Sequence, residues 1–313
     1  MLRPHAGARR IRNDDLRQRL GEVRRQHPES RAWLALFEAA LDEYERNDAW
    51  EGAAVSPAPD RPAGAPLLYG SAITVDGRTI RRWVRRLLAL AAAEAGSDEA
   101  SLDRVRPARL DATALLEAAV CQDDPRVDAL AAAAGADPYA LRVVAQMGAL
   151  PLLQERGRAA GLEGQRSWLK GYCPVCGAWP TLAEFRGLER KRWLRCGRCG
   201  AGWEVPWLRC VFCDEANHEN LGYLTPEEGE QSRRAEVCYT CKGYLKAQST
   251  VRALPEWGTL LEDLATVPLD VAALERGYQR PQRPGYQLEV RLVLRPERWW
   301  SVPLGGRGRE ADS

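Results

Sequence analysis

Four C-x-x-C pairs decide the fold of this chain: Cys173-Pro-Val-Cys176, Cys196-Gly-Arg-Cys199, Cys210-Val-Phe-Cys213 and Cys238-Tyr-Thr-Cys241. A C-x-x-C turn can place two sulfurs on one metal ion, and two such turns complete a tetrahedron. One lone pair is weak evidence, whereas four in succession are a strong signal. The sequence therefore predicts two structural metal ions, each held by four cysteine thiolates, in two consecutive ribbon modules.

The residues between the pairs indicate which pairs share a metal ion. The first and second pairs bracket a predicted hairpin with strands at 179–186 and 189–195. The third and fourth bracket another, with strands at 220–224 and 233–237 and a turn at Pro226-Glu-Glu-Gly229. An interleaved cross-brace, which joins the first pair to the third, is the alternative. Sequential pairing predicts two ligand sets: Cys173, Cys176, Cys196 and Cys199, then Cys210, Cys213, Cys238 and Cys241.

Glycines stand next to several of these cysteines. Turns of this kind often need a residue with positive φ, which glycine adopts without steric cost. We therefore expect positive φ at four positions: Gly177, Gly197, Gly200 and Gly243.

Both predicted sites are closed, because four thiolates leave no coordination position for water or substrate. Zinc and iron both accept a tetrahedral all-sulfur site, and the spacing does not separate them. Iron would make the sites rubredoxin-like and redox-active, whereas zinc would make them inert. His218 lies between the third and fourth pairs, but eight cysteines already complete two sites. A redox enzyme that uses one C-x-x-C pair as a free dithiol is disfavoured, because all four pairs are predicted metal ligands. We therefore predict a protein without catalytic residues.

Length and charge set bounds on the class of protein. The 313 residues favour about two domains. The formal charge is +2, and eight thiolates with two divalent ions would bring it to about −2, so a general polyanion binder is not indicated. No run approaches the ~18 apolar residues of a membrane span. The basic segment Met1–Arg12 has no apolar stretch behind it and is a poor export signal, so we expect a cytoplasmic protein with reduced cysteines.

The first half has the apolar periodicity of helices. Asp137-Pro138 is a predicted N-cap with proline at the first helical position, and Gly96 is a predicted C-cap. Cys121 ends one helix and is expected to be a small buried hydrophobe, with no assigned role. The predicted helices span 14–26, 29–46, 78–96, 108–121, 125–134 and 137–158, with a loop at 47–66.

The helical period disappears after Gly161 and returns beyond Lys246. Residues 254–278 have a helical or mixed pattern, and the tail 280–313, with a short alternating run at 287–294, is expected to be loosely ordered. The predicted class is α+β, an all-helical domain followed by two small rubredoxin-like or zinc-ribbon β modules. The predicted domains are 1–165 (helical), 166–205 (first ribbon), 206–250 (second ribbon) and 251–313 (C-terminal segment and tail).

Basic residues cluster in the first ribbon. Between Arg166 and Cys213 there are nine basic and three acidic residues, and Trp193 lies within the basic run 190–195. Basic and aromatic residues interleaved in this way are typical of proteins that bind single-stranded nucleic acid. The competing interpretation is that these cations partly neutralise the anionic thiolate centre. Nucleic-acid binding by a double zinc ribbon is therefore the alternative function.

Several segments together resemble the formate dehydrogenase accessory protein family. The resemblance covers about 149–281, and the chain beyond Arg283 departs from the pattern. It is carried by these segments: Ala149-Leu-Pro-Leu-Leu153, Trp168-Leu-Lys-Gly-Tyr-Cys-Pro-Val-Cys-Gly177, Arg192-Trp-Leu-Arg-Cys-Gly-Arg-Cys199, Trp203, Arg209-Cys-Val-Phe-Cys213, Glu236-Val-Cys-Tyr-Thr-Cys-Lys-Gly-Tyr-Leu-Lys246, Leu261-Glu-Asp-Leu-Ala-Thr-Val-Pro-Leu-Asp270 and Gly277-Tyr278.

This resemblance implies a cytoplasmic maturation factor. Members of the family have a helical N-terminal part and two rubredoxin-like modules, reported to carry iron. They are needed for active respiratory formate dehydrogenase and are thought to bind its catalytic subunit before export. The eight cysteines correspond to the knuckle positions of that family. Formate, the enzyme and the partner subunit are implied by the resemblance alone.

Overall fold

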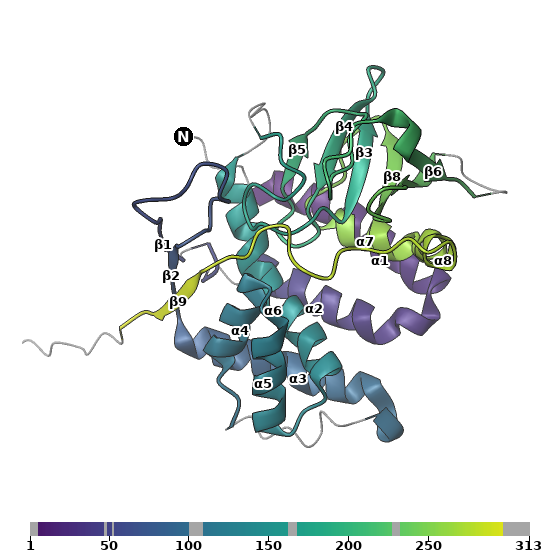
Figure 1. The fold of residues 1–313 in the computed structure, drawn as a ribbon. Helices are drawn as coiled ribbons and strands as arrows, with labels where there is room; N and C mark the ends of the chain where they lie inside the picture. Colours follow the sequence, from purple (N-terminus) through teal and green to yellow (C-terminus); the bar gives the residue numbers. More distant parts are fainter. Residues whose placement is uncertain are drawn as a thin grey trace, which may run out of the picture.

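Helices fill the first half of the chain, and a sheet with two further helices follows (Figure 1). The protein is therefore α+β, with a helical domain ahead of two ribbon modules, as predicted. Among the helices of the described residues, none has the length and apolar character needed to cross a membrane. The structure is a computed structural model that describes residues 6–46, 49–51, 53–99, 109–161, 168–226 and 232–296.

The helical domain contains the helices expected from the apolar periodicity. Asp137 caps the last of them by accepting the Ala140 N–H at 2.8 Å, with Pro138 at the first position, as predicted. The predicted C-cap at Gly96 is wrong, because the helix continues to Glu99. The helices are α1 (Ala6–Gln26), the short 3₁₀ helix η1 (Pro28–Ser30), α2 (Arg31–Arg46), α3 (Gly77–Glu99), α4 (Ala112–Cys121), α5 (Asp124–Ala134) and α6 (Pro138–Ala160).

A small three-stranded sheet lies beside these helices and includes the end of the chain. Strand β2 (Ala72–Val75) pairs antiparallel with β1 (Val55–Ser56) and parallel with β9 (Arg291–Leu294). The prediction that the tail is loosely ordered is therefore wrong for residues 280–294. Leu288, Val290 and Leu292 are buried, and the Leu292 N–H donates to Glu117 at 2.8 Å. Residues beyond 296 lie outside the described residues.

Strands of both ribbons form one six-stranded sheet. Both predicted hairpins are present, and β3 pairs in parallel with β8, which joins the two modules. Most of the predicted turn Pro226–Gly229 lies outside the described residues. The predicted domain boundaries are not tested by the structure and stay predictions. In the order β5-β4-β3-β8-β7-β6, the strands are β3 (Leu182–Arg186), β4 (Lys191–Arg195), β5 (Gly202–Glu204), β6 (Leu221–Leu224), β7 (Arg233–Cys238) and β8 (Tyr244–Thr250), with the 3₁₀ helix η4 (His218–Asn220) before β6.

One face of this sheet packs on α8 (Val267–Glu275), and a charged network beside this packing also ties the sheet to α7 (Gly258–Ala265). Lys246, only 2% exposed, contacts Asp263 Oδ1 at 2.7 Å and Asp270 Oδ2 at 2.6 Å. Arg280 bridges the same two carboxylates at 2.6 and 3.0 Å. Each buried charge is thus paired, which buried ions require.

The last described segment then crosses from α8 to β9 over the junction of sheet and helices (Figure 1). The Tyr286 N–H donates to Gly177 O at 2.8 Å, and the Trp179 indole N–H donates to Arg283 O at 2.9 Å. The Gln287 amide donates to Cys121 O at 2.7 Å. This segment therefore links the first cysteine turn to the helical domain.

Candidate metal centres

The four C-x-x-C turns share one backbone geometry. In each turn the first cysteine accepts, at its carbonyl, the N–H of the residue four positions on, at 2.9–3.1 Å. The N–H of that cysteine donates to the carbonyl five positions on, at 2.8–2.9 Å. The two bonds close a tight loop that brings both sulfurs of a pair to the same side. The short sequence repeat is therefore also a structural repeat.

The residue after the second cysteine of each turn has positive φ. Glycine occupies this position in the first ribbon, at Gly177 (70°) and Gly200 (71°), as predicted. In the second ribbon Asp214 (65°) and Lys242 (58°) adopt the same conformation. Non-glycine residues in this region carry a cost that the surrounding bonds must offset.

Gly197 and Gly243 do not have positive φ, so that prediction is wrong for both. Crowding explains these two glycines instead. A Cβ at Gly243 would lie 2.6 Å from the Phe212 ring, and one at Gly197 would lie 2.6 Å from Thr181 Oγ1.

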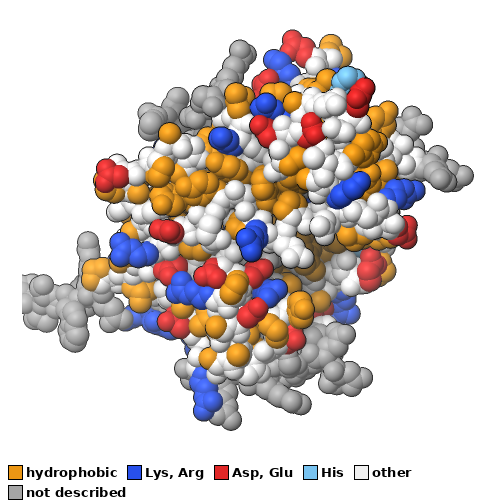
Figure 2. Space-filling view, viewed as in Figure 1, with side chains coloured by type: hydrophobic (Ala, Val, Ile, Leu, Met, Phe, Trp, Pro, Cys, Tyr) orange, Lys and Arg blue, Asp and Glu red, His pale blue; other side chains and the backbone are white. Residues whose placement is uncertain are grey.

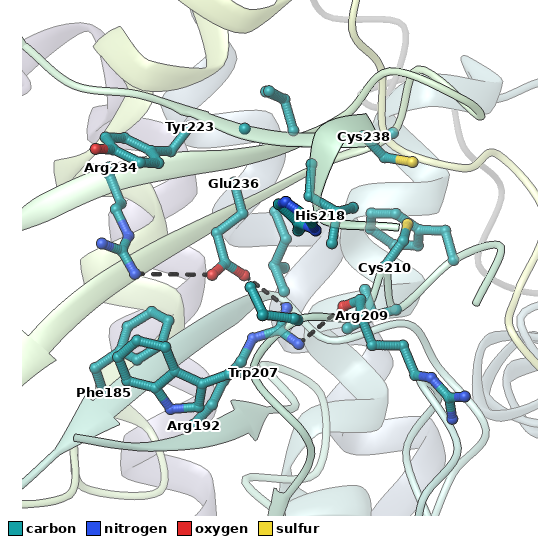
Figure 3. A pocket seen from close by; sticks show the side chains of 18 residues that line it. Phe185, Arg192, Trp207, Arg209, Cys210, His218, Tyr223, Arg234, Glu236 and Cys238 are labelled. Atoms are coloured by element: carbon teal, nitrogen blue, oxygen red, sulfur yellow. Dashed lines mark hydrogen bonds and ion pairs between the residues drawn. The ribbon is translucent and has the colours of Figure 1, made fainter. Parts of the chain in front are cut away.

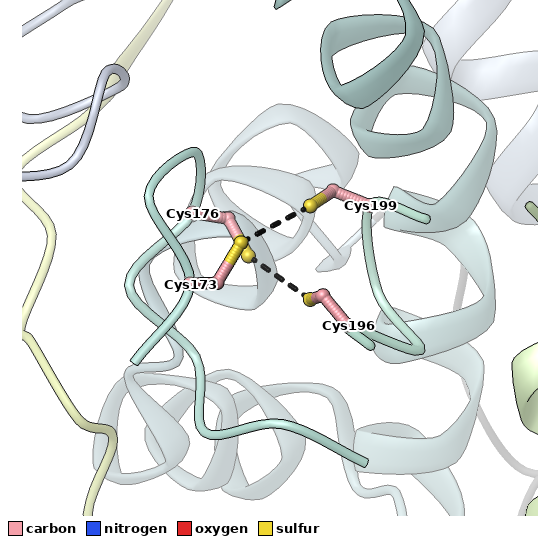
Figure 4. Close-up of side chains that lie close together, drawn as sticks. All are labelled: Cys173, Cys176, Cys196 and Cys199. Atoms are coloured by element: carbon pink, nitrogen blue, oxygen red, sulfur yellow. Dashed lines mark hydrogen bonds between the residues drawn. The ribbon is translucent and has the colours of Figure 1, made fainter. Parts of the chain in front are cut away.

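The structure brings the eight cysteines into the two sequentially paired groups. The interleaved cross-brace is therefore wrong. In the first group, sulfurs of different turns approach to 3.4 Å (Cys173 and Cys199) and 3.5 Å (Cys176 and Cys196), as drawn in Figure 4. In the second group the corresponding two distances between the turns are both 3.7 Å. Within each group the four sulfurs lie within 4.8 Å of one another. The groups are Cys173, Cys176, Cys196 and Cys199, and Cys210, Cys213, Cys238 and Cys241.

These separations fit a tetrahedral metal ion. Metal–sulfur bonds of ~2.3 Å place tetrahedral sulfurs about 3.8 Å apart, whereas a disulfide needs about 2.05 Å. Both groups could therefore hold one ion each, with the eight cysteines as candidate ligands. A divalent ion bound there would supply the positive charge that holds four thiolates together, and iron would add one-electron redox chemistry.

Burial and backbone dipoles act in opposite directions on these thiols. Burial raises the pKa of Cys173 and of Cys199 well above the ordinary value. The Val175 N–H lies 3.4 Å from Cys173 Sγ, and the Gly243 N–H lies 3.4 Å from Cys241 Sγ. Such N–H groups stabilise bound thiolates. A cation is nevertheless needed for all four buried thiols of the first group to ionise together.

The two groups differ in exposure. In the first group every cysteine is at most 1% exposed and belongs to the main hydrophobic core. In the second group Cys213 is exposed and Cys241 is half-buried. The second ribbon packs against α8 through a small separate cluster that includes Val237, Tyr244 and Leu269. Access from solvent is therefore much easier to the second centre.

Helix α6 holds the first centre at very close range. The Gln154 side chain donates to the carbonyl of Arg198 at 3.3 Å, inside the second cysteine turn. A Cβ on Gly157 would lie 1.7 Å from the carbonyl oxygen of Cys199. The sequence analysis missed this contact, although an isolated glycine inside a helix is a signal of close packing.

The remaining candidate residues lie apart from the two centres. Cys121 is buried beside Val290, and burial raises the pKa of its thiol. His218 lies outside both four-cysteine groups of the described residues.

Internal contacts use part of the predicted basic cluster. Arg192 is 4% exposed and pairs with Glu236 at 2.6 Å. Arg195 is 3% exposed and lies 3.8 Å from buried Glu184. These two cations are therefore not available to a nucleic-acid backbone.

The fold and these centres define a class of protein in which a helical domain carries a double four-cysteine ribbon. Residues 208–285 match the family model described as "FdhE, C-terminal domain". The "Protein FdhE homolog" of Aquifex aeolicus (strain VF5) is 31% identical over 139 residues, 42% of this chain and 47% of that protein. The homolog of Stutzerimonas stutzeri (strain A1501) is 37% identical over 111 residues, 34% of this chain and 35% of that protein.

These matches confirm the resemblance predicted from the cysteine segments: over the matched residues the chain is similar to FdhE proteins. The matched segments span less than half the length of these curated relatives. The crystal structure of the FdhE protein from Pseudomonas aeruginosa is similar with a TM-score of 0.55 and 23% identity. That similarity covers 85% of this chain and 92% of the other, and it shows a shared fold.

Proposed function

We propose that this protein is a cytoplasmic accessory factor that formate dehydrogenase needs for activity, and that it binds the catalytic subunit through its ribbon modules. One observation carries the proposal: residues 208–285 match the FdhE C-terminal domain, and they contain the second four-cysteine group, three of the six strands of the joint sheet (β6, β7 and β8) and both C-terminal helices. The resemblance of the cysteine segments to the formate dehydrogenase accessory family supplies the enzyme and the partner.

The two centres have a structural role in this proposal. The eight cysteines bind two ions, iron or zinc, and every metal position is taken by a protein sulfur. The ions cross-link loops that have little core of their own and so fix the shape of the joint sheet. The protein then acts by binding and not by catalysis.

Gene deletion in the host tests the function. Formate-dependent dye reduction should be lost while an immunoblot still detects the catalytic subunit. Plasmid-borne wild type should restore activity, and Cys173→Ala with Cys176→Ala should not, because the first centre loses half its ligands. Cys121→Ala is the matched control, since Cys121 lies outside both centres, and it should restore activity. Full dye reduction in the deletion strain would refute the function.

A binding measurement tests the mechanism. Tagged wild-type protein should retain the catalytic subunit on affinity resin, and the Cys173→Ala, Cys176→Ala double variant should not. An equal yield of the subunit with the double variant would show that the first ribbon plays no part in the interaction.

A further inference from the structure

A groove lies on the outer face of the joint sheet, opposite α7 and α8 and next to the second four-cysteine group (Figure 3). Its volume is about 250 Å³, more than the ~150 Å³ of an apolar cavity that admits benzene. Strands β3, β7 and β8 form its floor, and the segment 207–212 forms one wall. Arg192 holds that wall in place by donating to the carbonyls of Pro206 and Arg209, both at 3.1 Å.

Large apolar side chains line the groove and reach the solvent at its rim. Phe185 packs edge-to-face against Trp207, with ring centroids 4.8 Å apart. Trp207 is 45% exposed, Leu208 62% and Tyr223 64%. Hydrophobic side chains gather on the upper part of the surface, over the sheet (Figure 2). Exposed aromatic and apolar residues around a concave site are typical of protein-binding surfaces.

Strand β6 borders the groove and is an edge strand. Within the described part of the chain it pairs with β7 alone, and Leu221, Gly222 and Tyr223 line the groove. The outer side of an edge strand presents backbone N–H and C=O groups to any extended chain that lies along it. Recognition by strand addition uses those groups for affinity and a neighbouring pocket for one side chain.

The charged side chains in the groove indicate which charge a bound segment must carry. Its lining has three guanidinium groups, at Arg192, Arg209 and Arg234, and one carboxylate, at Glu236. Glu236 is engaged by Arg192 at 2.6 Å and lies 3.9 Å from Arg234. Arg234 stacks over Phe185 at 4.3 Å and near Tyr223 at 5.4 Å. In the described residues Glu236 is the one acidic group within ion-pair distance of Arg234, so this cation can accept a further carboxylate.

A filled metal centre adds a charge at the other end. Four thiolates and a divalent ion carry −2, and Cys210 and Cys238 line that end of the groove. The groove is therefore positive at Arg234 and negative at the metal centre. It favours a bound segment whose negative end lies at Arg234 and whose positive end lies at the metal centre.

We propose that this groove binds an extended segment of the partner protein, which adds to β6, packs a large apolar side chain in the groove against the Phe185–Trp207 ring pair, and places a carboxylate on Arg234. The inference deepens the proposed function, because it assigns the surface that meets the partner. The second four-cysteine centre then acts as the support that keeps the groove in shape.

Two surface variants test the groove, each with a matched control. Leu208→Glu and Tyr223→Glu put a carboxylate on the rim at exposed positions. Leu188→Glu and Tyr139→Glu make the same changes at residues that are 104% and 75% exposed elsewhere. The probe is the purified catalytic subunit of the host formate dehydrogenase, measured by biolayer interferometry against full-length, metal-loaded protein. We expect Kd to rise at least tenfold for both rim variants and less than twofold for both controls.

Hydrogen exchange in the complex tests strand addition. Amides of 221–224 should become protected when the subunit binds, and Arg234→Gln should raise Kd by about fivefold or more while keeping two metal ions per chain. Wild-type binding with equal Kd for rim and control variants would overturn the groove and leave the proposed function standing. Failure of the wild type to bind the subunit would overturn both. A homodimer in solution that Tyr223→Glu dissociates would assign the groove to a second copy and refute the proposal.

Discussion

Replacing Gly157 by alanine gives opposite predictions from helix propensity and from packing. Glycine inside a helix costs about 0.5–1 kcal/mol relative to alanine, so propensity predicts a more stable protein. In the structure the new Cβ would lie 1.7 Å from the Cys199 carbonyl oxygen, whereas ordinary contact begins near 3.4 Å. Helix α6 and the cysteine turn would have to separate by about 1.7 Å. Overpacking usually costs about 1–3 kcal/mol, and a contact this close places the cost at or above the upper end of that range. After the gain in helix propensity we expect a net loss of about 2–3 kcal/mol.

The assay is thermal unfolding of metal-loaded protein followed by circular dichroism. For 313 residues, 1 kcal/mol corresponds to about 1.5 °C, so Tm should fall by about 3–5 °C in Gly157→Ala. Gly21→Ala is the matched control, because Gly21 also lies inside a helix and its Cβ would approach only the flexible Arg25 side chain, at 3.7 Å. It should raise Tm by about 1 °C. A rise in Tm for Gly157→Ala as well would refute the reasoning.

Three further predictions follow from the same structure. A chromogenic chelator should remove the two metal ions in two phases, the first from the centre with exposed Cys213, and a single phase with both ions would contradict the difference in burial. Lys246→Met should destabilise the protein by about 1.5–3 kcal/mol, because Asp263 and Asp270 lose their buried cation and keep only Arg280, whereas exposed Lys170→Met should change Tm by less than 1 °C. Burial and the hydrogen bond to Asp270 raise the pKa of Tyr244 to about 12, so the folded protein keeps a proton that the unfolded chain releases near pH 10, and stability falls between pH 10 and 12. Tyr244→Phe should make the fall in Tm between pH 9 and pH 11 smaller, and exposed Tyr139→Phe should leave it unchanged.

Local patterns in the sequence predicted much of this protein. The C-x-x-C pairs predicted the grouping of all eight cysteines, because each turn is closed by bonds within six residues and each hairpin connects consecutive pairs. Apolar periodicity predicted the helices for the same reason, since a helix depends on neighbours three and four positions away. Asp137 and Pro138 marked a helix start through their own backbone geometry.

Contacts between distant segments decided what the sequence analysis missed. The parallel pairing of β3 with β8 joins residues more than sixty positions apart, and β9 reaches back to β2. The position of Gly157 against Cys199 likewise depends on how α6 meets the second cysteine turn. The sequence alone determined the helices and the two four-cysteine centres, because those depend on short-range geometry. Only the tertiary structure decided the joint sheet, the ordered C-terminal segment, the difference in exposure between the centres and the groove beside β6, because these depend on which surfaces pack together.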